Sequence, residues 1–340
     1  MNIYDVSRRA GVSIATVSRV LNNNPHVSGE TRDRVMRVIE ECGYIPNAFA
    51  RGLGLNTMRT IGLLCPDASD PYQGQALSCL ESLFREKGYD SLLICTGSSH
   101  EARQAGVENL KNRHVDGIVL MGSSFIGETE EENAYIREAA ESFPVALLNG
   151  DYSAPGVYCA LCDDEKASRE AVNHLAAAGR TRILHLYHAR SWSGKRKLSG
   201  YRKALEDNGI PFDEKLLREA GKESRNIPRV AEMLREIARE GCRFDAVFCS
   251  EDTLAVGAVK YALSEGLRIP EDLAVAGYNN SPLCLCCEPE ITSVENRLDA
   301  LCARITEMMT EALEGGEPEN RAVFEGSLAV RRSTRREGNA

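Results

Sequence analysis

From Thr60 onward, short apolar runs alternate with stretches of helical periodicity, and this alternation restricts the fold more than any other feature. Runs that are apolar throughout are typical of strands buried on both faces of a parallel sheet. The pattern occurs twice in tandem, separated by an extended segment at Tyr158–Cys162. We therefore predict two lobes, each a doubly wound parallel sheet covered by helices. The predicted strands are Ile61–Cys65, Leu92–Cys95, Ile118–Met121 and Val145–Leu148, then Ile183–Tyr187, Ala246–Cys249 and Leu273–Ala276, and the predicted helices lie near 72–87, 100–112, 130–142, 164–177, 195–208, 227–239 and 252–265.

Before this region, residues 2–21 predict two short helices joined by a tight turn. Asn2 is placed to cap the first helix, with Asp5 three residues on. Gly11 stands where the turn requires a positive φ, and Ser13 is placed to cap the second helix. The inward residues of the second helix are Val17, Val20 and Leu21. This pattern is typical of a helix-turn-helix, whose second helix enters the DNA major groove. An ordinary helical hairpin packed on a domain edge is the alternative.

A third helix and a short helical segment follow. Ser28 is placed to cap the third helix and Gly43 to end it. The apolar stripe of this helix consists of Val35, Val38, Ile39 and Cys42. Asn47–Leu53 is a further segment of helical character, but about seven residues are too few to be stably helical in water. We expect this segment to fold only against a partner.

Motifs along the chain resemble those of the LacI/GalR family of bacterial repressors. They are Tyr4-Asp5-Val6, Gly11-Val12-Ser13, Thr16-Val17-Ser18-Arg19-Val20-Leu21-Asn22, Val27-Ser28, Tyr44-Ile45-Pro46-Asn47-Ala48, Ile61-Gly62-Leu63, Val115-Asp116-Gly117-Ile118 and Val330-Arg331-Arg332-Ser333-Thr334. The resemblance covers essentially the whole chain. It implies a helix-turn-helix DNA-binding domain at 1–46, a hinge helix and linker at 47–59, and a two-lobed effector-binding and dimerisation domain at 60–340 that is similar to the periplasmic sugar-binding (type I) fold.

The first residues of the second helix are expected to face DNA base edges. Ile14 and Ala15 suit contact with thymine methyl groups, and Arg19 is the best candidate for a bidentate contact to guanine. Short polar side chains suit phosphate contacts that set register. For Thr16 and Ser18, a place on the helix surface without function is the alternative. The polar candidates are Ser13, Thr16, Ser18, Asn22 and His26.

By resemblance, Asn47–Leu53 is the hinge helix that pairs with its dimer mate in the minor groove. Leu53 stands where the family has a leucine that opens the central base step and bends the duplex. A plain linker with an incidental leucine is the alternative, and Gly52 weakens the helix. The resemblance adds Tyr4, Asn47 and Ala50 to the DNA-contacting residues.

The charge of the chain is divided unevenly. The net charge is −9, yet residues 1–60 hold eight arginines and five acidic residues, for a net +3, and the remainder carries −12. A small basic region on a large acidic one suits a protein whose N-terminal part alone contacts phosphates. Because the sequence has neither an apolar run of roughly 20 residues nor a secretory signal layout, we expect a cytoplasmic protein without membrane contact.

Twelve cysteines are scattered along the chain, mostly within apolar strands, and we expect them to behave as small buried hydrophobes. The CxxC pair Cys159 and Cys162, and the cluster Cys284, Cys286 and Cys287, raise the alternative of a metal or redox sensor. In an extended segment, however, residues three apart point to opposite faces. We therefore predict no metal site and no cofactor.

Ligands of parallel α/β sheets lie beyond the carboxyl ends of the strands, so effector contacts are expected in the loops that follow each strand. Carboxylates and amides there suit a hydroxyl-rich ligand. Trp192, the only tryptophan, is a candidate for stacking on a sugar ring, with a partly exposed loop anchor as the alternative. The candidate effector-binding residues are Asp70, Tyr72, Ser123, Asn149, Asp163, Arg190, Trp192, Lys197, Glu251 and Asn279.

Two of these positions depart from the family pattern. Lys197 stands three residues before Gly200-Tyr201, where the family usually has arginine, and lysine lacks the planar guanidinium fork. Asn279 replaces the aspartate of the Gly-Tyr-Asp motif, and an amide donates as well as accepts hydrogen bonds. The resemblance therefore does not imply the identity of the sugar.

The resemblance implies a dimeric repressor of carbohydrate-utilisation genes that binds palindromic operator DNA under control of a sugar-like effector. A regulator that answers to a nucleobase or a protein co-effector is the alternative, and a solute-binding protein is an alternative of another class. No enzyme is predicted, because no phosphate-binding glycine loop or nucleophile motif occurs in suitable context. Since no leucine heptad follows Arg336, a dimer is expected rather than a tetramer.

Overall fold

The computed structural model describes residues 2–21, 24–44 and 57–335. The chain divides into two compact units: one holds the residues up to Thr60 together with His114–Asp116, and the other holds the remainder. We call residues 2–44 the head and the second unit the body. Within the described ranges no helix has the length and apolar character to cross a membrane.

The head consists of three helices, α1 (Ile3–Ala10), α2 (Ile14–Leu21) and α3 (Gly29–Glu41). Its small core is formed by side chains that are at most 3% exposed, and these are Val6, Ala10, Val17, Val20 and Val35. The core brings together all three helices, as the apolar spacing predicts.

Local hydrogen bonds define the ends of the head helices. Asn2 and Asp5 form the predicted capping box, in which the Asn2 side chain accepts from the backbone of Tyr4 and Asp5. Gly11 has a φ of +64°, and the Ser7 hydroxyl donates to the Val12 carbonyl at 2.6 Å, which closes the turn between α1 and α2. The turn therefore requires glycine at one position and a small hydroxyl residue at another.

The body consists of two lobes, each built on a six-stranded sheet. In the first lobe the strand order is β11-β5-β4-β3-β1-β2, and the pairings of β3 with β1 and β4 and of β5 with β4 and β11 are parallel. The strands are β1 (Thr60–Cys65), β2 (Asp90–Cys95), β3 (Gly117–Met121), β4 (Val145–Leu148), β5 (Val157–Cys162) and β11 (Arg321–Phe324), and the helices are α5 (Pro71–Glu86), α6 (His100–Asn112), α7 (Ala134–Ala140) and α12 (Leu298–Leu313).

The second lobe repeats this plan with the order β12-β10-β9-β8-β6-β7, and only β12 runs antiparallel, against β10. Its strands are β6 (Ile183–Tyr187), β7 (Leu217–Glu219), β8 (Ala246–Cys249), β9 (Ala274–Tyr278), β10 (Thr292–Glu295) and β12 (Ser327–Ala329), and its helices are α8 (Asp164–Ala177), α9 (Trp192–Asp207), α10 (Ile227–Arg239) and α11 (Asp252–Ser264).

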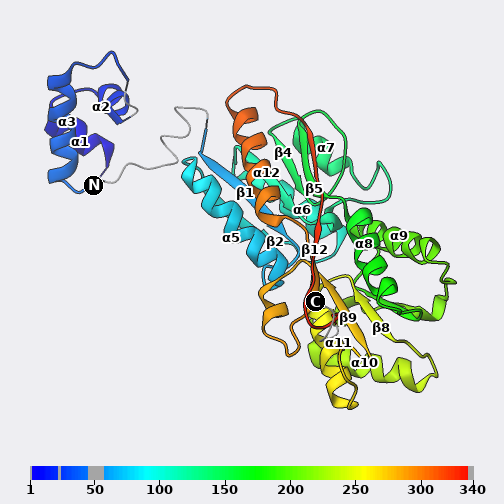
Figure 1. The fold of residues 1–340 in the computed structure, drawn as a ribbon. Coiled ribbons are helices and arrows are strands. Elements are labelled where there is room, and N and C mark those ends of the chain that lie inside the picture. The colour runs from blue at the N-terminus through cyan, green and yellow to red at the C-terminus, as the bar shows by residue number, and fades with distance from the viewer. Residues whose placement is uncertain (1, 22–23, 45–56, 336–340) are drawn as a thin grey trace. The chain divides into compact units, whose positions relative to one another are not determined.

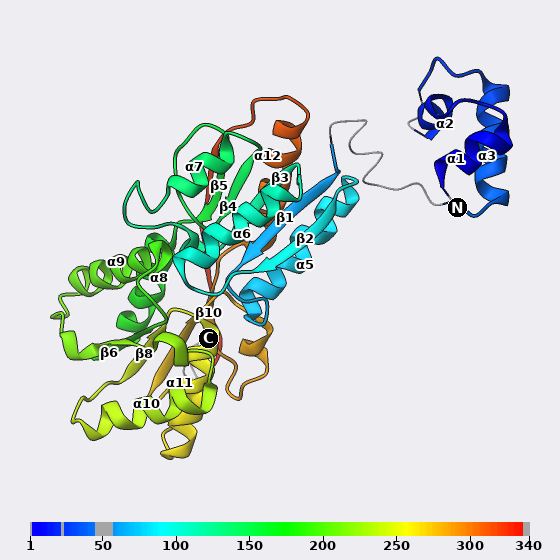
Figure 2. The ribbon, with the colours of Figure 1, turned by 180° about the vertical axis from the view of Figure 1, so that it is seen from behind.

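The chain passes between the lobes three times: from β5 to α8, from β10 to α12, and from β11 to β12. Figures 1 and 2 show α12 with the first lobe, although it directly follows β10 of the second lobe in sequence. Helix α12 buries Leu301, Ile305 and Met309 in the core of the first lobe. Each lobe is thus completed by residues near the C-terminal end of the body.

The predicted strands all occur, with ends that shift by at most two residues, and the predicted helices occur as α5 to α11. The largest difference among the helices is at α7, which begins at Ala134 rather than near residue 130. Four strands and one helix lie beyond those that the alternating pattern predicts, namely β7, β10, β11, β12 and α12.

The two CxxC cysteines lie on the extended strand β5, as predicted, and both are buried. The Cys159 thiol donates to the Tyr152 carbonyl at 3.4 Å, whereas the Cys162 sulfur lies 4.0 Å from the Tyr278 hydroxyl. The two sulfurs therefore face different surroundings. Within the described part of the chain, no group of three or more His, Cys, Asp or Glu side chains is arranged to hold a metal ion.

Candidate functional site

One face of α2 is free to contact a large ligand. Successive helical residues turn by about 100°, so the burial of Val17 and Val20 turns Ile14, Ala15, Ser18 and Arg19 outward. Ile14 is 39% exposed, and Ala15 and Arg19 are exposed as well, whereas Ser18 is half-buried. An apolar side chain and a guanidinium on one exposed face suit contacts with base edges in the major groove.

The remaining polar candidates in the head surround this face. Ser13 caps α2 by accepting from the Thr16 backbone N–H at 3.1 Å, and its hydroxyl also lies 2.9 Å from the Thr16 hydroxyl. Tyr4 is 62% exposed and His26 is exposed, while Thr16 is half-buried. Four predicted DNA contacts lie outside the described residues, and these are Asn22, Asn47, Ala50 and Leu53.

The body holds a cavity of about 980 Å³ lined by both lobes. Its walls are the segments that follow β1, β2, β3, β4, β6, β7, β8 and β9, at the carboxyl ends of these strands. This is the location expected for a ligand of such sheets. Eight predicted effector residues line the cavity, and these are Asp70, Tyr72, Ser123, Asn149, Arg190, Lys197, Glu251 and Asn279.

Trp192 and Asp163, the other two predicted effector residues, do not line this cavity. Trp192 is the first residue of α9, whose cavity-facing side consists of Ser193, Gly194 and Lys197. The indole instead lies beside the Arg196 guanidinium, whose Cζ atom is 6.0 Å from the centroid of the Trp192 ring. Asp163 caps α8 by accepting from the Lys166 backbone N–H at 3.1 Å. In both cases the prediction followed sequence order, whereas helical rotation and capping decide the direction of the side chain.

Three polar atoms of the cavity wall are buried and have no hydrogen-bond partner among the described residues. They are the Tyr72 hydroxyl, the Gln73 Oε1 and the Glu251 Oε1. Burial raises the pKa of the Glu251 carboxyl, and the nearby Asp70 carboxylate raises it further. A buried polar atom without a partner costs about 1–3 kcal/mol, so a ligand that pairs with these atoms gains affinity.

Lys197 lines the cavity and belongs to a buried network of polar contacts. Its Nζ donates to the Ser250 carbonyl at 3.0 Å and lies 3.7 Å from the Tyr278 ring centroid. The Tyr278 hydroxyl donates to Asp164 at 2.6 Å, and the Ser193 hydroxyl donates to the other oxygen of the same carboxylate. Asp164 is 1% exposed. This carboxylate therefore fixes both the first turn of α9 and the aromatic ring beneath Lys197.

Polar side chains also join the two lobes across the cavity. Arg225 forms ion pairs with Asp67 and with Asp70. The Ser123 hydroxyl donates to the Ser191 hydroxyl at 3.0 Å, and Lys195 pairs with Glu128. These contacts are exposed or half-buried, so solvent screens them and each stabilises the arrangement of the lobes only weakly. A ligand that binds both lobes can therefore outweigh them.

Two predicted residues use part of their hydrogen-bonding capacity within the protein. The Asn149 side-chain oxygen accepts from the Cys162 backbone N–H at 3.1 Å. The Asn279 side-chain oxygen accepts from the Asn296 amide at 3.1 Å. Each has a positive φ, +57° and +95° respectively. The amide NH₂ group of each side chain is the part left to contact a ligand.

Several cavity residues escaped prediction. His188 directly follows the strand that ends at Tyr187. The expectation that ligand contacts lie in the loop after each strand selected Arg190, and it applies equally to His188. Gln73 lies one residue beyond Tyr72. Arg225 follows β7, a strand of three residues that is too short for any periodicity to reveal.

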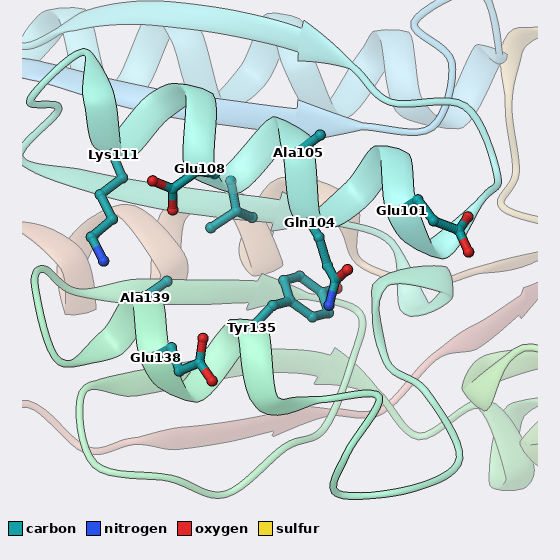
Figure 3. Close-up of a pocket in the computed structure, with 9 residues that line it drawn as sticks. Glu101, Gln104, Ala105, Glu108, Lys111, Tyr135, Glu138 and Ala139 are labelled. Carbon is teal, nitrogen blue, oxygen red and sulfur yellow. The ribbon is translucent and has the colours of Figure 1, made fainter.

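A second, smaller cavity of about 370 Å³ lies between α6 and α7 of the first lobe (Figure 3). Its wall carries Glu101, Glu108, Glu138 and Lys111, and only one lobe contributes to it. None of the predicted effector residues lines it. The cavity between the lobes is therefore the candidate effector site.

Two family descriptions match the chain. Residues 2–47 match bacterial regulatory proteins of the lacI family, and residues 58–327 match periplasmic binding proteins and the sugar binding domain of the LacI family. An HTH-type transcriptional regulator of Lachnoclostridium phytofermentans is 45% identical, covering 98% of this chain and 99% of the relative.

Two solved structures are similar over the same length. The Lac repressor dimer bound to operator and the anti-inducer ONPF has a TM-score of 0.83 at 25% identity, and the transcriptional regulator CelR–cellobiose complex has a TM-score of 0.71 at 27% identity. Each comparison covers 98% of this chain and 99% of the other.

Proposed function

The chain belongs to the LacI family of bacterial regulatory proteins, and we propose that it represses carbohydrate-utilisation genes under the control of a sugar that binds between the lobes of its body. The family consists of DNA-binding transcriptional regulators and not of enzymes. The two states of such a regulator differ in the arrangement of its lobes, and a sugar shifts the balance by its differential affinity for the two states.

The unpartnered polar atoms of the cavity carry the proposal of a sugar. The Tyr72 hydroxyl needs an acceptor, and the Gln73 oxygen needs a donor. A sugar hydroxyl supplies both functions, and several hydroxyls on one ring can reach several wall residues. The cavity volume of about 980 Å³ suits a sugar larger than one ring, and a similar regulator, CelR, has been solved with cellobiose.

A thermal-shift screen of sugars, sugar phosphates and purines tests this proposal. We expect one sugar to raise the melting temperature by several degrees, and isothermal titration calorimetry with that sugar gives its Kd. Replacing Tyr72 by phenylalanine removes one donor from the cavity and is expected to weaken this sugar about fivefold to tenfold. Tyr152→Phe, whose hydroxyl bonds Glu130 outside the cavity, is the matched control. Stabilisation by purines alone would overturn the sugar proposal.

The proposed DNA contacts lie on the head and in the segment 47–53. Arg19, Ile14 and Ala15 read base edges, while Tyr4 and the short polar residues contact the backbone. Asn47, Ala50 and Leu53 contact the minor groove, with Leu53 as the wedge. The palindromic operator requires two heads, so the protein acts as a homodimer in the cytoplasm. The exposed Leu263 and Leu285 of the second lobe support self-association, being 56% and 58% exposed.

Replacing Arg19 by alanine is expected to relax base preference at one position of each half-site. The loss of a bidentate contact to guanine removes about 1–3 kcal/mol of discrimination. Selection from a random duplex pool, followed by sequencing, measures the change. Arg37→Ala on the exposed face of α3 is the matched control, and it should weaken binding equally to all sequences. An unaltered motif in the Arg19 variant contradicts its role in base reading.

A further inference from the structure

Two cysteines lie side by side where β1 and β2 end. The Thr96 backbone N–H donates to the Cys65 carbonyl at 2.9 Å, which sets Cys65 opposite Cys95 on the neighbouring strand. Their sulfur atoms are 3.8 Å apart. The separation is the contact distance of two thiols, and both side chains therefore lie on the same face of the sheet.

This geometry is close to that of a disulfide. A disulfide requires sulfur atoms about 2.05 Å apart and Cα atoms about 4.4–6.8 Å apart. Neighbouring strands are about 4.8 Å apart, which lies inside the second range. Rotation of the two side chains together with a small shift of the strand ends is therefore enough to join the sulfur atoms.

The two thiols differ in access to solvent. Cys95 is exposed, whereas Cys65 is 0% exposed. Burial, together with the adjacent Cys95, raises the pKa of the Cys65 thiol to about 12. Because Cys95 is the thiol in contact with solvent, it meets an oxidant first, and Cys65, whose sulfur is 3.8 Å away, is the thiol placed to resolve the product.

The pair is directly connected to the cavity between the lobes. Pro66 and Asp67 follow Cys65, Gly97 and Ser98 follow Cys95, and all four residues line the cavity. The Gly97 backbone N–H donates to the Pro66 carbonyl at 2.8 Å, so the two loops move together. Asp67 also pairs with Arg225 of the second lobe. The loop that follows Cys65 therefore carries one residue of a contact between the lobes.

We propose that Cys65 and Cys95 form a reversible disulfide, and that its formation shifts the Pro66–Asp67 and Gly97–Ser98 segments at the edge of this cavity. The oxidant is a small-molecule disulfide. The Cys95 thiolate attacks one of its sulfur atoms and expels a small thiolate, which takes up a proton. The Cys65 sulfur then attacks Cys95 and breaks its bond to the second small thiolate, which takes up the Cys65 proton and leaves as a thiol, so that the protein disulfide is formed. Disulfides of intracellular proteins are commonly transient and redox-sensing, in line with this role.

Oxidation of the full-length protein with glutathione disulfide, followed by alkylation, digestion and mass spectrometry, tests the pairing. We expect one cross-linked peptide joining Cys65 to Cys95, which dithiothreitol removes. The cross-link should be absent in Cys95→Ser and retained in Cys286→Ser, a matched change of another exposed cysteine. Glutathione retained on Cys95, or a link between two copies of Cys95, overturns the proposal.

Hydrogen–deuterium exchange of the cross-linked protein tests the coupling. We expect exchange in residues 67–70 and 224–226 to change at least threefold on oxidation in the wild type and in Cys286→Ser, and not in Cys95→Ser. Unchanged exchange in cross-linked protein overturns the coupling. Neither measurement uses DNA or a sugar. The inference rests on the proposed function only in naming the cavity an effector site, so a failure of one is distinguishable from a failure of the other.

Discussion

Replacing Asp164 by alanine is expected to lower the free energy of unfolding of the body by about 3 kcal/mol. The Asp164 carboxylate accepts hydrogen bonds from the buried Ser193 and Tyr278 hydroxyls, and both donors lose their acceptor in the variant. Ser193 lines the cavity from the first turn of α9, and the Tyr278 ring lies beneath Lys197, which also lines it. The same change should therefore weaken sugar binding at least tenfold. Urea unfolding followed by Trp192 fluorescence gives the stability, and titration gives the affinity.

Two variants make this prediction specific. Asp163→Ala removes the neighbouring carboxylate, which caps α8 from a partly exposed position, and should cost only about 1 kcal/mol. Asp164→Asn keeps one acceptor oxygen without the charge, so its stability should lie between those of the wild type and the alanine variant. Equal destabilisation by Asp163→Ala and Asp164→Ala would show that the buried network has no special role.

Acidification is expected to destabilise the body through His185. This side chain is 0% exposed and stacks between Tyr201 and Phe248, with ring centroids 5.1 Å and 5.0 Å away. Its Nδ1 lies 3.1 Å from the Phe248 carbonyl, while the buried Nε2 has no partner among the described residues. Burial lowers the pKa of His185 to about 4. The folded protein thus holds the ring neutral where an unfolded chain would protonate it.

The sign of the effect follows from this difference in pKa. An unfolded histidine takes up a proton below a pH of about 6.5, so the contribution of the neutral ring is complete above that pH. It is lost as the pH falls toward 4, at about 1.4 kcal/mol per pH unit, for about 3 kcal/mol in all. Urea unfolding of the wild type and His185→Phe between pH 7 and 4 measures the effect. The phenylalanine variant should lose less stability on acidification, and parallel curves would contradict the assignment.

The head helices and the buried strands of the body could be predicted because signals within a few residues of each other determine them. The head helices follow from caps and turns within a few residues of each other, such as Asn2 with Asp5 and Gly11. Several buried strands of the body are apolar along their whole length, as β3 illustrates with every residue buried. Short-range pattern and fixed period are enough for such elements.

Other features depend on contacts between distant residues. Strand β12 has three residues and pairs with β10, more than thirty residues earlier in the chain. Arg225 reaches the cavity only because Asp67 and Asp70 of the other lobe lie opposite it. Trp192 was predicted to stack on a sugar from its polar surroundings, but it begins α9 and does not line the cavity, whereas the next two residues, Ser193 and Gly194, do. A single sequence carries no local signal for these outcomes.

The three passages of the chain between the lobes have a consequence for dissecting the protein. Neither lobe corresponds to one uninterrupted stretch of the gene, because α12 and β11 of the first lobe are encoded after β10 of the second. A fragment that stops at Cys162 would expose the apolar surface on which α12 packs, and it would leave β5 without its paired edge strand β11. Joining residues 57–162 directly to residues 296–325 would restore α12 and β11. We expect this shortened protein to fold as an isolated first lobe.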